Sequence, residues 1–128
     1  MPATYRIDAE KRRVFTSMDG VLTYREATSL IAKMGADPLF NPAYTELSDL
    51  REVTSVEMTM DQIAELAALR VFARTSRRAI VATNPLYFGM ARMYESHHEA
   101  SSGGNVRVFS EMAEALLWID SGARPDTP

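Results

Sequence analysis

Hydrophobic and polar residues alternate in two short segments near the start of the chain, residues 5–8 and 14–18. The second segment is rich in residues that favour strands. The polar residues 9–13 between them are enough for an antiparallel connection, and Asp19 and Gly20 are expected to close the second strand. The pattern therefore predicts that the chain opens with a β-hairpin.

Four later segments place apolar residues three and four positions apart, which is the spacing of an amphipathic helix. Thr23 and Thr59 precede the first two, and each is followed three residues later by Glu or Gln, as in a capping box. Asn84 precedes the third, with Pro85 at the first helical position. Ser110 is expected to cap the last, and the second helix is expected to reach Phe72.

Strands are predicted between these helices. Residues 79–82 form a continuous apolar run, typical of a strand buried on both faces of a parallel sheet, and residues 44–50 and 106–109 are the other two. Residues 51–58 are expected to be a polar connection. The order β-β-(α-β)3-α predicts one α/β domain over residues 1–120, with a five-stranded, mainly parallel sheet and an antiparallel first strand. The proline-rich residues 121–128 are expected to form a flexible tail.

Composition excludes several kinds of chemistry. The chain has 128 residues, 46% of them hydrophobic, and no cysteine, so thiol catalysis, disulfides and cysteine-based metal sites are excluded. A net charge of −3 gives no general attraction to nucleic acid or anionic membranes. There is no apolar stretch typical of a signal peptide or a membrane span, so we expect a cytoplasmic protein.

The order of the elements and two short motifs resemble the STAS and SpoIIAA-like superfamily. The first motif is Asp49, Leu50 and Arg51, and the second is Phe-Gly-Met-Ala-Arg-Met-Tyr-Glu at residues 88–95. Within that superfamily, the chain is similar to the small bacterial SpoIIAA-like proteins of unassigned function. The resemblance implies a (βα) superhelix with its strands in chain order. It also implies a regulatory or ligand-sensing role without catalysis or a cofactor.

In the anti-sigma-factor antagonists of that superfamily, a serine at the start of the second helix is phosphorylated within Asp-Ser-Ser-Gly. The matching residues here are Glu57, Met58, Thr59 and Met60, which keep the acid and one hydroxyl but lose the other serine and the glycine. Thr59 can accept a phosphate at the positive end of a helix. The alternative is that Thr59 is a plain helix cap, which is a common role for threonine.

Polar residues expected near the carboxyl ends of the strands form the first candidate site, because open α/β sheets bind ligands in the crevice outside those ends. Arg51 can hold an acidic group there, or it can simply pair with Asp49 or Glu52. The candidate ligand- or partner-binding residues are Asp49, Arg51, Glu57, Thr59, Asn84 and Tyr87. The leading hypothesis is a non-enzymatic module that binds a partner protein or a small ligand at this edge.

An apolar pocket is the second candidate site. Met90, Met93 and Tyr94 can line such a pocket or belong to the core, and the helical Gly89 is expected to allow close packing or to make room for a ligand. Such a pocket would support the alternative hypothesis, in which the protein carries an apolar or lipid-like molecule, as the related CRAL-TRIO architecture would allow. That alternative requires a cavity of roughly several hundred Å³.

The remaining polar groups give weaker signals. A small hydrolase or isomerase using Asp49, Glu57 or His98 is a third alternative. His97 and His98 are adjacent on a helix and share no face, so no metal site is predicted. The arginines near the end of the second helix offset its negative end, and no aromatic platform accompanies them, so nucleic-acid binding is not expected. A homodimer that uses the edge of the first strand is the expected assembly.

Overall fold

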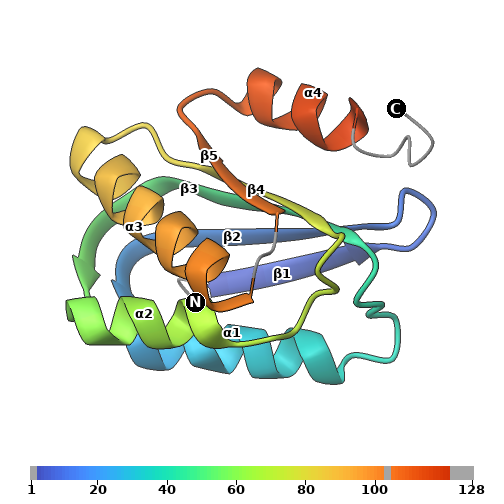
Figure 1. The fold of residues 1–128 in the computed structure, drawn as a ribbon, viewed down its shortest axis with the longest axis horizontal. Helices are drawn as coiled ribbons and strands as arrows, with labels where there is room; N and C mark the ends of the chain where they lie inside the picture. The colour runs from blue at the N-terminus through green and yellow to red at the C-terminus, as the bar shows by residue number, and fades with distance from the viewer. Residues whose placement is uncertain (1–2, 103–104, 122–128) are drawn as a thin grey trace.

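Five strands form a single sheet and lie side by side in chain order (Figure 1). The computed structural model describes residues 3–102 and 105–121. The elements are β1 (Ala3–Asp8), β2 (Arg13–Thr23), α1 (Tyr24–Ala36), β3 (Thr45–Glu57), α2 (Met60–Ala68), β4 (Arg77–Val81), α3 (Pro85–Ser102), β5 (Asn105–Phe109) and α4 (Met112–Ser121). Strand β1 runs antiparallel to β2, and the other pairs are parallel, so the predicted fold class is confirmed.

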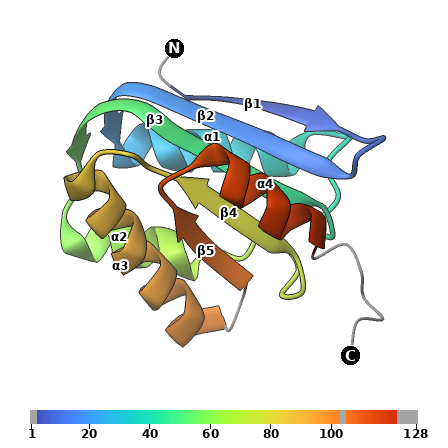
Figure 2. The ribbon, with the colours of Figure 1, turned by 90° about the horizontal axis from the view of Figure 1, so that it is seen from above.

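The helices divide between the two faces of the sheet. Helices α1, α2 and α3 cover one face, and α4 alone covers the other (Figures 1 and 2). Strand β1 lies at one edge, where the homodimer prediction requires an exposed strand; the dimer itself stays a prediction. Ser121 is the last residue of α4, and the rest of the predicted tail, residues 122–128, lies outside the described residues. Among the helices described, none has the length and apolar character needed to cross a membrane.

Strands β2 and β3 are longer than predicted. Strand β2 continues past Asp19 and Gly20, and β3 continues through residues 51–57, where a polar connection was expected. The pairing between them shifts twice: Ser17 and Asp19 pair with Asp49 and Glu52, and Gly20 and Val21 pair with Val53 and Ser55. Each shift gives β3 one extra residue, which is a β-bulge.

The two bulges explain why the second half of β3 is not recognisable from its pattern. A bulge moves every later side chain to the opposite face of a strand, because side chains alternate with a period of two. Leu50, Val53 and Val56 are therefore three residues apart and yet all line the same side of the sheet. The alternation of apolar and polar residues that identifies a strand is therefore lost in this part of β3.

The predicted starts of the first three helices are confirmed. The Thr23 hydroxyl accepts a hydrogen bond from the Glu26 N–H at 3.2 Å, and the Thr59 hydroxyl accepts one from Gln62 at 3.1 Å. The Asn84 side-chain oxygen accepts from the Leu86 N–H at 2.9 Å. Helix α2 ends at Ala68, before the predicted Phe72, and the residues that follow it still face inward.

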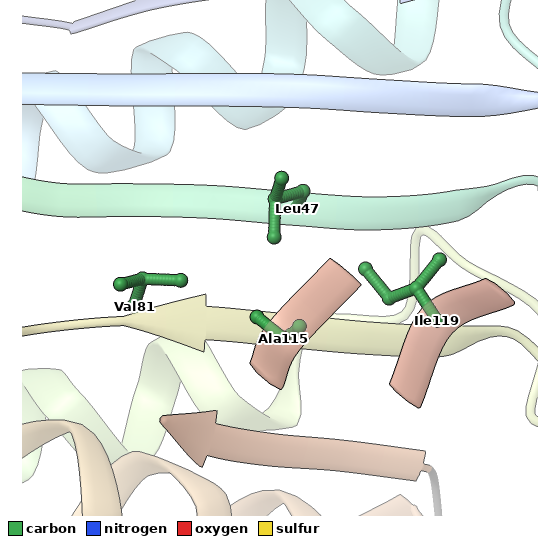
Figure 3. Close-up of a cluster of buried hydrophobic side chains, with 5 residues drawn as sticks. Leu47, Val81, Ala115 and Ile119 are labelled. Carbon is green, nitrogen blue, oxygen red and sulfur yellow. The ribbon is translucent and has the colours of Figure 1, made fainter. Parts of the chain in front are cut away.

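Helix α4 packs on the sheet through a buried apolar cluster formed by Leu47, Val81, Ala79, Ala115 and Ile119 (Figure 3). The predicted cap at Ser110 is wrong by one position: the helix begins at Met112, and the Glu111 carbonyl accepts the N–H of Ala115. Helix α4 contacts β3, β4 and β5. Beside it, the Arg6 guanidinium lies 4.2 Å from the centre of the Phe15 ring.

Gly20 and Gly89 differ in whether their backbone conformation tolerates a side chain. Gly20 has a φ of 65°, a left-handed conformation, and an added Cβ would meet no atom within 4 Å. Gly89 is an exposed helical residue whose added Cβ also meets nothing, so the expected close packing at Gly89 is wrong. Of these two positions, a side chain therefore strains the backbone at Gly20 and not at Gly89.

We expect Gly20→Ala to lower the free energy of unfolding by about 1–2 kcal/mol, because alanine disfavours a positive φ. Gly89→Ala is expected to raise it by about 1 kcal/mol, because alanine is the better helix former. Urea denaturation of the two variants and the wild type measures both effects. A change of the same sign in both variants would contradict this description of the backbone.

Candidate functional site

A cavity of about 140 Å³ lies between the sheet and helices α1, α2 and α3. Most of its lining is apolar, with side chains from all three helices and from β2, β3 and β4, among them Leu22, Leu30, Val53, Ile63, Ile80 and Met90. A protein cavity of about 150 Å³ lined by such side chains stays dry and binds benzene. The space is therefore of the right size and polarity for a single small apolar group.

Small side chains help to keep this space open. Helices α1 and α3 present the buried residues Ala27 and Ala91 to the cavity, so each helix faces it with a methyl group at that point. The bulged part of β3 supplies Leu50, Val53 and Val56 to the wall. The sequence features that build the cavity are thus two alanines at inward helical positions and two extra residues in one strand.

A buried polar cluster forms one part of the cavity wall. The Arg78 Nε donates to Glu46 at 2.9 Å, and its terminal nitrogens lie 3.1 Å from the Tyr94 hydroxyl and 3.1 Å from the His98 Nε2. The Thr16 hydroxyl donates to the second Glu46 oxygen at 3.2 Å. Except for His98, all of these residues line the cavity. The cluster joins β2, β3, β4 and α3.

The protonation states of this cluster follow from its burial. Desolvation acts to lower the pKa of Arg78, but the neighbouring Tyr94 and Glu46 groups outweigh it, so the pKa is raised and the guanidinium stays charged. Burial, together with the charges of Arg78 and Arg70, lowers the pKa of His98 from 6.5 to about 4. A neutral His98 can accept the Arg78 hydrogen bond. Among the described residues, every buried side-chain nitrogen and oxygen has a hydrogen-bond partner.

The predicted residues at the strand ends do not form one site. Arg51 donates two hydrogen bonds to the Asp49 carboxylate, each at 3.0 Å, and this contact lowers the pKa of Asp49. Asp49 lines a groove with Phe15 and Met112, on the α4 face of the sheet. The local pairing that was one alternative for Arg51 is therefore present, and the pair lies on the face opposite the cavity.

The other residues predicted at the strand ends also lie outside the cavity, with one exception. Glu57 is exposed at the end of β3, while the Thr59 hydroxyl and the Asn84 side-chain oxygen are occupied as helix caps. Tyr87 alone among the strand-end residues lines the cavity, and its hydroxyl donates to the Thr54 carbonyl at 2.5 Å. Of the pocket candidates, the structure places Met90 and Tyr94 in the cavity wall but not Met93.

Sequence reasoning missed the polar part of the site, namely Thr16, Glu46, Arg78 and the inward orientation of His98. The alternation in the strands contained a signal, because Glu46 and Ser48 share a face with Leu50, and Arg78 shares one with Ile80. Within residues 3–102 and 105–121, no three acidic, histidine or cysteine side chains gather as they would to hold a metal ion.

Acid titration tests the environment of His98. Between pH 6.5 and 4 the unfolded chain binds a proton at this residue that the folded protein does not, so stability falls as the pH drops through that range. The loss reaches about 3 kcal/mol. We expect His98→Gln, whose amide oxygen can still accept from Arg78, to lose less stability than the wild type over this range in denaturation experiments. If His98→Gln lost as much stability as the wild type over this range, the assignment would be wrong.

The two ion pairs of β3 should differ in strength. Arg78→Met leaves the Glu46 carboxylate buried without its cation, so we expect a loss of about 3–5 kcal/mol in unfolding free energy. Arg51→Met removes the cation of an exposed pair and should cost less than about 1 kcal/mol. Chemical denaturation measures both. Equal costs would show that Glu46 is not held in a desolvated environment.

Comparisons with known proteins identify the fold. No family model matches the chain, and no curated protein matches it. Among solved structures, it is similar to an uncharacterised protein from Shewanella loihica PV-4, described as a DUF3478 family member with a SpoIIAA-like fold. The two share 16% sequence identity, and the match covers 91% of each chain with a TM-score of 0.58. The protein therefore has the SpoIIAA-like fold that its sequence resembles.

Proposed function

We propose that this protein is a non-enzymatic, ligand-sensing module that binds a small, mainly apolar molecule between its sheet and helices α1, α2 and α3. The observation that carries the proposal is the apolar cavity of about 140 Å³ at this position. The ligand site is thus beneath the helices and not in the crevice outside the strand ends. Partner binding at the strand ends stays a prediction.

The size of the cavity limits the ligand. At about 140 Å³ it is smaller than the several hundred Å³ expected for a lipid carrier and close to the volume that accommodates benzene. A single aromatic ring or a short branched aliphatic group matches this space. The ligand is therefore apolar, as in the carrier hypothesis, but it is a compact molecule and not a lipid-like one.

The polar residues of the wall favour binding over catalysis. Arg78 and Glu46 neutralise each other at 2.9 Å, and the Thr16 and Tyr94 hydroxyls are bonded to the same pair. His98 does not line the cavity itself, and its lowered pKa and its contact with Arg78 make it a poor proton acceptor at neutral pH. These groups can orient a ligand through hydrogen bonds, which is the usual role of a few polar groups in an apolar pocket.

Titration of the full chain with toluene, followed by amide NMR shifts, tests this function. We expect saturable shifts centred on cavity residues such as Leu30 and Ile63, and a higher melting temperature, because a ligand that binds only the folded state stabilises it. Ala91→Leu extends a side chain into the cavity and should weaken toluene binding by about tenfold or more, or 1.4 kcal/mol.

The control is Ala100→Leu, which adds the same atoms at an exposed position of the same helix and should bind toluene like the wild type. Ala27→Leu fills the cavity from α1 and provides a second test if Ala91→Leu folds poorly. Unchanged toluene affinity in a folded, cavity-filling variant would rule out this cavity as the ligand site.

A further inference from the structure

A second, polar pocket of about 220 Å³ adjoins the apolar cavity. Its polar lining residues are Arg70, Arg74, Ser76, Arg78, His98 and Asn105. These residues come from the α2–β4 connection, β4, α3 and the start of β5, so the tertiary fold and not one local segment brings them together. The function proposed above makes no use of this pocket.

The two spaces share part of their walls. Leu69, Phe72 and Arg78 line both of them. The Arg78 guanidinium lies over the Phe72 ring, 4.7 Å from its centre, so this cation is next to apolar surface on one side. A ligand whose apolar part occupies the cavity can therefore place a polar group against Arg78, at the boundary with the polar pocket.

The charge at this boundary favours an anion. Arg70, Arg74 and Arg78 contribute three positive charges to the pocket, and Arg78 is paired with the Glu46 carboxylate. A guanidinium has five N–H donors, and the Arg78 contacts with Glu46, His98 and Tyr94 engage one donor each. Arg78 can thus donate to one more acceptor without leaving Glu46.

The helix-end explanation of the arginines accounts for only part of this arrangement. Arg70 follows the end of α2 at Ala68, where a positive charge offsets the helix dipole. Arg78 lies in β4, and Arg74 lies in the connection before it, so neither belongs to the last turn of α2. Convergence of the three on one pocket requires another explanation.

We propose that the natural ligand is an amphipathic anion, with a compact apolar body in the cavity and an oxyacid head group, a carboxylate or a phosphate ester, at Arg78 and the pocket beyond it. This inference rests on the proposed function and adds the chemical class of the ligand. Arg70 and Arg74 attract the head group from outside, an effect that salt screens.

Calorimetric titration with three probes of similar shape tests the head group: phenylacetate, phenyl phosphate and the neutral phenylacetamide. We expect at least one of the two acids to bind about tenfold or more tightly than the amide, and added salt to reduce that advantage. Comparison of the two acids identifies the preferred head group.

Arg70→Gln combined with Arg74→Gln should weaken binding of the preferred acid by about threefold or more and leave toluene binding unchanged. Both residues are exposed, so the fold should tolerate the change. Arg25→Gln combined with Arg92→Gln is the matched control, because it removes the same charge from exposed positions outside both pockets. The control should bind acid and toluene as the wild type does.

The possible failures are distinguishable. If toluene binds and neither acid binds more tightly than phenylacetamide, the amphipathic anion is ruled out and the proposed function remains. An acid advantage that the control variant loses as much as the Arg70 and Arg74 variant would also overturn the inference, because it would reflect net charge alone. If toluene and all three probes fail to bind, the proposed function falls as well.

Discussion

The buried ion pair between Arg78 and Glu46 is the interaction on which the rest of the helix-covered face depends. Glu46 and Arg78 are direct partners in the register of β3 and β4, so the pair also fixes how these strands align. A slip of β4 by one residue would carry Arg78 to the apolar face beneath α4 and leave Glu46 buried without its cation. Removing two charges from water is costly, and that cost is offset by their mutual attraction, by the hydrogen bond that Thr16 donates to Glu46 and by the one that Tyr94 accepts from Arg78.

Much of the fold could be predicted from local patterns. The order of elements followed from periodicity, and the caps at Thr23, Thr59 and Asn84 followed from residue types at fixed spacing, because a cap is formed within a few residues. The second half of β3 could not be predicted, since its two bulges exist only in relation to β2. The extra residues break the alternation in β3, and nothing within that segment shows that a neighbouring strand compensates for it.

In the candidate site, too, contacts between residues close in sequence could be predicted and contacts between distant residues could not. Asp49 and Arg51 are two residues apart and stand out in the sequence, and they pair with each other on the opposite face from the cavity. The pairs that shape the cavity join residues about thirty positions apart, as with Thr16 and Glu46 or Glu46 and Arg78. Single-sequence reasoning finds short-range pairs and overlooks long-range ones, because only folding brings the latter together. Tyr87, Met90 and Tyr94 were found because helical spacing alone places them on an inward face.

Among the described residues, α4 is the only helix on its side of the sheet, and it contacts β3, β4 and β5 (Figure 2). Phe15 points to this side, and its ring is shielded by the guanidinium of Arg6 from the adjacent strand. A charged side chain laid across an aromatic ring keeps an open sheet face from presenting a bare hydrophobic patch to other molecules. Arg6 therefore reduces the apolar surface that this part of the sheet exposes to other molecules. A second protein that docks flat on these strands must first displace the Arg6 side chain.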